Sequence, residues 1–201
     1  MKPKTILKEL KEHIPFTLVA TLTAVLIIVF VLYGIKKQIP TELFEIFHPL
    51  HVIASSIVTT AIFYKYKQKI IPAILVGISG SIIIGSLSDI IFPYLGGNLL
   101  NLQTSFHLPL FESTTLILSV ALMGSLIGII TKKTQLPHYI HVFLSVFASL
   151  FYLLNFSQAF NLIHFIGAFF VVFIAVIVPC CLSDIVFPFL FIKNEKSKSR
   201  T

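Results

Sequence analysis

Long apolar stretches dominate this sequence and limit the folds open to it. A helix needs roughly 20 apolar residues to cross the core of a bilayer. Six stretches reach or approach that length, over residues 16–35, 48–64, 70–94, 112–131, 138–155 and 161–191. Runs such as AVLIIVFVL do not alternate apolar and polar residues, as the strands of a membrane barrel would. The sequence therefore predicts an all-α, polytopic membrane bundle of six transmembrane helices.

The composition excludes several classes of protein. Hydrophobic residues make up 56% of the 201 residues and charged residues only 11%, whereas a soluble domain carries about 25% charged residues. A soluble enzyme and a disordered chain are therefore excluded. The net charge of +7 is also typical of nucleic-acid binding, but the lysines flank the apolar stretches. We therefore expect the lipid bilayer as a partner, and no nucleic acid.

The basic residues predict the orientation of the spans. With a cytoplasmic N-terminus, all fifteen except Lys36 and Lys37 fall on the cytoplasmic side, as the positive-inside rule requires. We expect a multi-pass protein of the cell membrane with both termini in the cytoplasm. The first apolar run is too long for a signal peptide, so it is expected to remain as a span. Residues 3–13 are predicted to form a short amphipathic helix at the membrane surface.

Four landmarks recur in the same order in the two halves of the chain. The first half contains HIPF, KK, HPLHVIAS and SDIIFP, and the second contains HLPL, KK, HYIHVFLS and SDIVFP. They divide the chain into two three-helix repeats, residues 1–100 and 101–192, and a basic tail, residues 193–201. Because three is odd, the second repeat should run upside down relative to the first. Inverted repeats are typical of secondary transporters, although a duplicated gene without a transport role remains an alternative.

Ionisable residues within membrane spans are costly and usually functional. Six of the seven histidines and both aspartates fall on the landmarks. Histidines three residues apart on a helix have Cβ atoms about 5–6 Å apart, which lets both imidazoles reach one cation. The matched pairs are His13 with His107, His48 with His138, His51 with His141, and Asp89 with Asp184.

The predicted topology sorts these residues into two metal sites at opposite faces of the membrane. His48, His51, Asp89 and His107 form the outer set, and His138, His141, Asp184 and His13 form the inner set. A proline four residues after each aspartate should free the aspartate's own carbonyl oxygen. Nitrogen and oxygen ligands of this kind suit divalent zinc, manganese, iron, cobalt or nickel.

Two serines follow these histidine pairs by one helical turn. Ser55 follows His51, and Ser145 follows His141. We expect them either to orient the imidazoles or to bond back to their own helices.

The sequence therefore predicts a transporter of a divalent transition-metal cation. The chain lacks the glycine-rich and Walker A patterns of nucleotide sites, so transport would use an ion gradient or facilitated diffusion. Six spans are few for a complete transporter, and a homodimer is expected on size. The alternatives are a membrane metalloenzyme of the di-iron hydroxylase kind, a haem binder, a proton relay, a site for a polar or anionic substrate, and a non-catalytic scaffold.

Overall fold

The structure is a computed structural model. It describes residues 3–131, 135–158, 160–181, 187–188 and 190–191, and the side chains of 3–13, 135–138 and 180–181 are not described. All regular elements among these residues are helical, which confirms the predicted all-α class. The elements are α1 (Pro3–Val29), η1 (Phe30–Gly34), α2 (Leu43–Tyr66), α3 (Ile70–Ser86), η2 (Leu87–Ile91), α4 (Phe92–Leu99), α5 (Pro109–Glu112), α6 (Thr114–Thr131), α7 (Gln135–Phe156), α8 (His164–Ala175) and η3 (Val176–Cys181).

Five helical segments are long and apolar enough to cross a membrane. They are Ile14–Gly34, Leu43–Tyr66, Ile70–Leu99, Thr114–Thr131 and Tyr139–Phe156. The sixth predicted span, 161–191, falls partly outside the described residues. Its described part contains a shorter apolar helical segment, His164–Pro179.

The N-terminal segment differs from the prediction of a separate surface helix. Residues 3–13 continue without a break into the first span as one 27-residue helix. Pro15 lies within this helix, where it removes one backbone hydrogen bond without ending the helix. The predicted interfacial helix is therefore wrong as a separate element, because no residue between 3 and 29 breaks the helical hydrogen-bonding pattern sharply enough.

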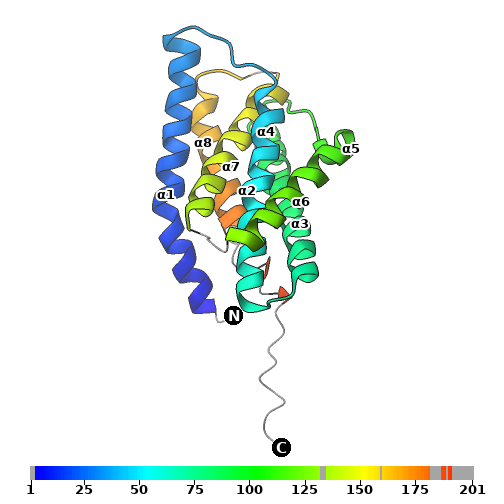
Figure 1. Ribbon diagram of the computed structural model, residues 1–201. Coiled ribbons are helices and arrows are strands. Elements are labelled where there is room, and N and C mark those ends of the chain that lie inside the picture. The colour runs from blue at the N-terminus through cyan, green and yellow to red at the C-terminus, as the bar shows by residue number, and fades with distance from the viewer. Residues whose placement is uncertain (1–2, 132–134, 159, 182–186, 189, 192–201) are drawn as a thin grey trace, which may run out of the picture.

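Helix α2 lies at the centre of the packing. It contacts α3, α6 and α7, while α1 packs against α7 and α8 (Figure 1). Gly124 and Gly128 of α6 form a G-x-x-x-G pattern, which lets helix backbones approach closely. A Cβ atom at Gly128 would lie 2.6 Å from the carbonyl oxygen of Ile57. Only glycine at these two positions allows α6 to approach the α2 backbone so closely.

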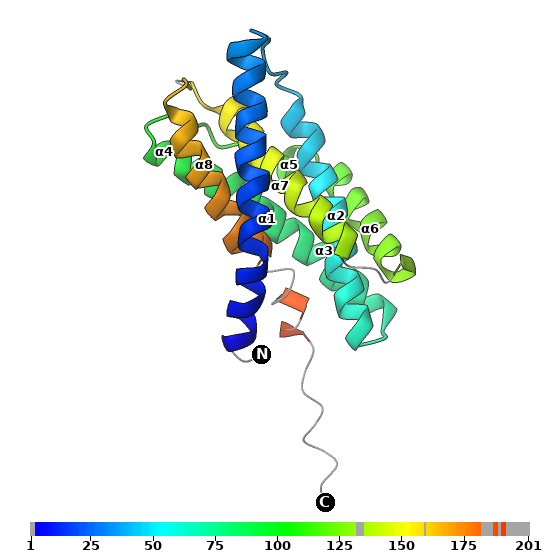
Figure 2. The same cartoon turned by 90° about the vertical axis from the view of Figure 1, so that its left-hand side faces the viewer.

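The helices of the bundle are staggered and tilted relative to one another. Helix α2 reaches well below the start of α7 in both views of the fold (Figures 1 and 2). Residues near the start of α7 are therefore level with the middle of α2. This stagger decides which histidines meet.

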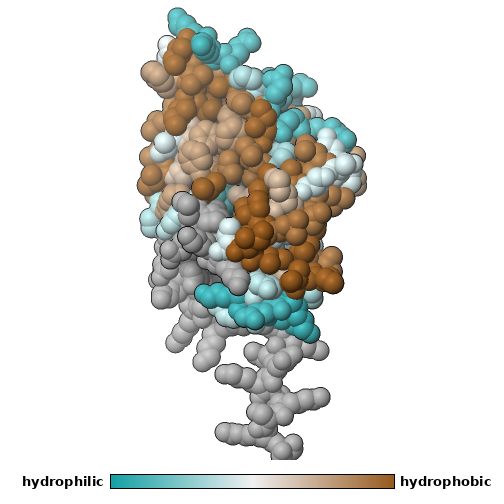
Figure 3. Space-filling view, viewed as in Figure 1, coloured by the Kyte–Doolittle hydropathy of each residue, from teal (hydrophilic) through white to brown (hydrophobic). Residues whose placement is uncertain are grey.

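The surface has the pattern of a membrane protein. A broad hydrophobic region covers the middle of the face in Figure 3, and hydrophilic residues gather at the top and along the lower rim. Large apolar side chains such as Ile130, Leu75 and Phe30 are more than half exposed. A soluble protein rarely exposes apolar surface on this scale. The exposed apolar belt agrees with lipid contact by the five candidate spans.

Candidate functional site

The site is built around Asp89, which lies where the third candidate span loosens into a π turn. In η2 the N–H of Phe92 donates to the carbonyl of Leu87, five residues back. The next residue, Pro93, has no N–H to continue this pattern to the carbonyl of Ser88. The hydroxyl of Ser149 on α7 lies 3.0 Å from that carbonyl oxygen. Pro93 therefore leaves the carbonyl of Ser88 without the donor that the π register would supply. The predicted freeing of the Asp89 carbonyl stays a prediction.

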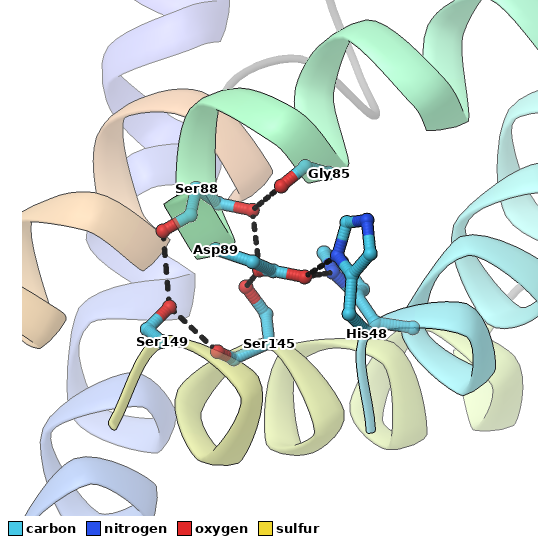
Figure 4. A network of polar contacts seen from close by, with 7 residues as sticks. His48, Gly85, Ser88, Asp89, Ser145 and Ser149 are labelled. Atoms are coloured by element: carbon cyan, nitrogen blue, oxygen red, sulfur yellow. Dashed lines mark hydrogen bonds and ion pairs between the residues drawn. The ribbon is translucent and has the colours of Figure 1, made fainter. Parts of the chain in front are cut away.

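The Asp89 carboxylate accepts hydrogen bonds from four side chains (Figure 4). Its Oδ2 atom lies 2.9 Å from His48 Nδ1 and 2.6 Å from His51 Nδ1. Its Oδ1 atom accepts from the hydroxyls of Ser88 at 2.7 Å and Ser145 at 2.9 Å. A carboxylate offers about four lone-pair positions, and four donors occupy them here. We call Asp89, His48, His51, Ser88 and Ser145, together with His141 and Ser149, the Asp89 cluster.

The Asp89 cluster is sealed from solvent. Asp89, His51 and Ser145 have no exposed surface, and His48 is 2% exposed. A carboxylate that is buried without partners would carry a desolvation cost of several kcal/mol. The two imidazoles and two hydroxyls offset that cost by bonding directly to both oxygens. A buried carboxylate with both oxygens bonded in this way is costly to disrupt.

The carboxylate also selects the form of both imidazoles. Ionised Asp89 can only accept, so Nδ1 of His48 and Nδ1 of His51 each carry a proton. In the neutral imidazole the lone pair then lies on Nε2. Carboxylates that bond to Nδ1–H in this way orient metal-binding histidines in many proteins. In this geometry the carboxylate of Asp89 positions the histidines.

His141 joins the same cluster from the other half of the chain. Its ring stacks on that of His51, with centroids 5.0 Å apart and planes 9° apart. The prediction placed His141 at the opposite membrane face from His51, and this is wrong. It assumed helices of equal height, whereas α7 begins level with the middle of α2.

His107 lies in a different polar group from the one predicted. Its Nε2 atom lies 2.8 Å from Glu45 Oε1, and its Nδ1 atom lies 3.0 Å from Glu112 Oε1. The ring stacks on Phe156 at 4.5 Å. We call His107, Glu45 and Glu112 the His107 cluster. Phe44 contacts both clusters, because its ring lies 5.5 Å from that of His48 and 6.0 Å from that of His107.

The remaining predicted site residues are only partly described. His13 lies in α1 and His138 in α7, but their side chains are outside the described part. Asp184 lies outside the described residues altogether. Within the described part of the chain, no three or more His, Cys, Asp or Glu side chains are arranged to hold one metal ion. The inner set of ligands therefore stays a prediction.

Several site residues were not predicted in their observed roles. Ser145 bonds to Asp89, whereas it was expected to orient an imidazole or to bond to its own helix. Ser88 and Ser149 were not singled out. The S-D dipeptide of the repeat and a serine one turn after Ser145 were the available signals.

The comparisons with known proteins leave the site to be interpreted from its own geometry. No family model, no curated protein and no solved structure matches the chain.

Proposed function

We propose that this protein is a multi-pass membrane transporter with the Asp89 cluster as its cation site. The observation that carries this proposal is one buried carboxylate within a candidate span that accepts from two imidazoles and two hydroxyls. Ionisable groups at such depth are rare and usually mark ion pathways or proton relays. A purely structural role would be served more cheaply by apolar packing.

The substrate class follows from the atoms that the cluster offers. The imidazoles of His48 and His51 are bonded to Asp89 through Nδ1, and the ring of His141 lies beside that of His51. Imidazole nitrogen favours divalent zinc, iron, cobalt, nickel or copper over magnesium or calcium. We therefore propose a divalent transition-metal cation as the substrate.

The pattern of helix contacts supports an inverted repeat, which this function would use for alternating access. In chain order the six predicted spans contain α1, α2, α3 with η2 and α4, α6, α7, and α8 with η3. If each span of the first half is exchanged with its counterpart in the second half, the α2–α6 contact becomes the α7–α1 contact. The exchange likewise turns α3–α6 into α8–α1, and it leaves α2–α7 and η2–η3 unchanged. All these pairs are in contact.

Metal binding by the purified full chain tests the proposal. We expect detergent-purified protein to bind Zn²⁺ or Co²⁺, and a His48→Ala/His51→Ala variant to lose at least about tenfold in affinity, as removing imidazole ligands or their partners does elsewhere. His164→Ala is the matched control, because this histidine bonds only locally, accepting from the N–H of Asn161 at 3.2 Å. Equal affinity in all three proteins would contradict the proposal.

A membrane metalloenzyme is the second candidate, and one observation favours it. Histidines from both halves of the chain gather in one cluster, as they would around a catalytic metal. Anaerobic loading with Fe²⁺ followed by exposure to oxygen distinguishes the two functions. An enzyme of this kind would develop an iron(III) absorption band. A transporter would instead carry the Fe²⁺ unchanged across the membrane of proteoliposomes.

A further inference from the structure

Among the residues that the structure describes, four buried hydroxyl groups have no hydrogen-bond partner. They belong to Ser55, Thr59, Thr60 and Ser125, and all four residues are fully buried. A hydroxyl that is buried without a partner destabilises the folded state, because it has lost its hydrogen bonds to water. Four such groups in one region require a physical explanation.

The absence of partners is unusual within this chain. Serine and threonine in helices normally bond to a carbonyl of their own preceding turn. Thr21 does so with Thr17 at 2.8 Å, and Ser81 does so with Ile78 at 3.1 Å. The four hydroxyls make no such bond.

Two of these hydroxyls, those of Ser55 and Thr59, have counterparts in the second half of the chain that do form hydrogen bonds. Ser145 and Ser149 follow His141 by four and eight residues, as Ser55 and Thr59 follow His51. Ser145 donates to Asp89, and Ser149 lies within hydrogen-bonding distance of Ser88. The two serines of α7 therefore have polar partners, whereas Ser55 and Thr59 at the matching positions of α2 have none among the described residues.

Two of the four hydroxyls, those of Thr60 and Ser125, lie close together where α2, α3 and α6 meet. A Cβ atom at Gly77 would collide with Thr60 Oγ1 and would lie 2.6 Å from Ser125 Oγ. At Gly80 it would lie 3.0 Å from the methyl group of Thr59. The ring of Phe187 lies equally close to that position, at 3.0 Å. The two glycines therefore let polar side chains of α2 and α6 lie directly against the backbone of α3.

Along α2 the hydroxyls lead from the Asp89 cluster toward the end of the helix. Phe63 and Val76, with Ala73, form a small apolar cluster beyond Thr60. Both Phe63 and Val76 also line a pocket of about 310 Å³ that includes Lys67 and Ser79. The order along α2 is thus the two histidines that bond to Asp89, then the unpartnered hydroxyls of Ser55, Thr59 and Thr60, then the apolar cluster and the pocket.

We propose that the junction of α2, α3 and α6 binds water at these hydroxyls and forms the inner half of the cation path. Bound water would satisfy the four groups, as it does at other buried polar sites. Phe63 and Val76 would close the path toward the pocket in the state described here. The assignment of this junction to a cation path rests on the proposed transport function. The assignment of bound water does not.

Cysteine labelling tests the path in the full chain. Starting from a Cys180→Ala/Cys181→Ala background, we compare Thr59→Cys and Ser125→Cys with Thr21→Cys, using a small cationic methanethiosulfonate reagent in membranes. Only the thiolate reacts, and it forms where water reaches the sulfur. We expect the two junction positions to react at least about tenfold faster than position 21, given that apolar burial suppresses the thiolate. Equal rates would overturn the path.

Isosteric substitution tests the bound water independently. If the hydroxyls are dry, Thr60→Val removes an unpaired polar group and should raise the unfolding midpoint. If water is bound, Thr60→Val should lower the midpoint, as Thr21→Val does by losing its bond to Thr17. A rise in the midpoint would overturn the water site. Labelling without any metal binding would contradict the proposed function alone.

Discussion

The chain holds two groups of histidine and carboxylate that differ mainly in their surroundings. In the Asp89 cluster, one carboxylate with no exposed surface takes four donors. In the His107 cluster, one imidazole lies between two carboxylates, and the side chains of Glu45 and Glu112 are 44% and 60% exposed. We therefore expect the histidine–carboxylate contacts of the two clusters to contribute very different amounts to the free energy of unfolding, because water screens the charges of the exposed cluster and not those of the buried one.

The two clusters also differ in how their histidines are arranged. Both nitrogens of His107 lie within 3.0 Å of carboxylate oxygens, those of Glu45 and Glu112. In the Asp89 cluster, His48 and His51 share one carboxylate oxygen through Nδ1, and the ring of His141 stacks on that of His51. The buried cluster therefore gathers three imidazoles, whereas the His107 cluster holds one.

Removing the buried carboxylate should have the largest effect. We expect Asp89→Ala to lower the free energy of unfolding by about 3–5 kcal/mol, because it leaves two imidazoles buried without their acceptor. The measurement is the unfolding midpoint in detergent with increasing SDS. Asp89→Asn, which keeps one oxygen acceptor, should lose less. A loss below about 1 kcal/mol for Asp89→Ala would contradict this expectation, because it would equal the contribution of an exposed surface ion pair.

Removing one hydroxyl donor should have an intermediate effect. Ser145→Ala deletes a 2.9 Å bond to the buried carboxylate, and bonds to charged groups contribute about 1.5–3 kcal/mol. Ser79→Ala is the matched control, since its hydroxyl bonds to the Leu75 carbonyl of its own helix at 2.7 Å. Equal midpoints for the two variants would show that the Asp89 cluster draws no extra stability from this serine.

Removing an exposed carboxylate should have a small effect that depends on salt. We expect Glu112→Gln to cost about 0.2–1 kcal/mol at low ionic strength. The loss should shrink in 1 M NaCl, where the screening length is about 3 Å. The loss for Asp89→Ala should not change with salt. Unfolding curves of both variants at low and high salt check this contrast, and a salt-independent loss for Glu112→Gln would contradict it.

Coupling between the clusters should be the smallest effect. The clusters share no hydrogen bond among the described residues, and the ring of Phe44 lies between them. We expect Asp89→Asn and Glu112→Gln to be additive within about 0.3–0.5 kcal/mol in a double-mutant cycle. An interaction energy above about 1 kcal/mol would mean that Phe44 transmits changes from one cluster to the other.

Part of the site could be predicted from the sequence. The H-x-x-H spacing puts His48 and His51 on one helix face, and the S-D-I-I-F-P motif marked Asp89. The structure brings these three side chains together. Their predicted role as metal ligands is untested. Asp89 was predicted as a ligand. In the structure its carboxylate accepts hydrogen bonds from His48 and His51 and so orients their rings.

The sequence by itself determined the class of fold and the rarity of its polar groups. Long apolar runs can only form helices in lipid, because each backbone group must be bonded within its own segment. The helix stagger, the π register at Asp89 and the partners of His141 and His107 were decided by tertiary structure. Those features depend on how closely glycines let neighbouring helices approach, and on where one helix begins relative to another. Contacts of this kind join residues such as Ser145 and Asp89, which lie 56 positions apart in the chain, so no local pattern encodes them.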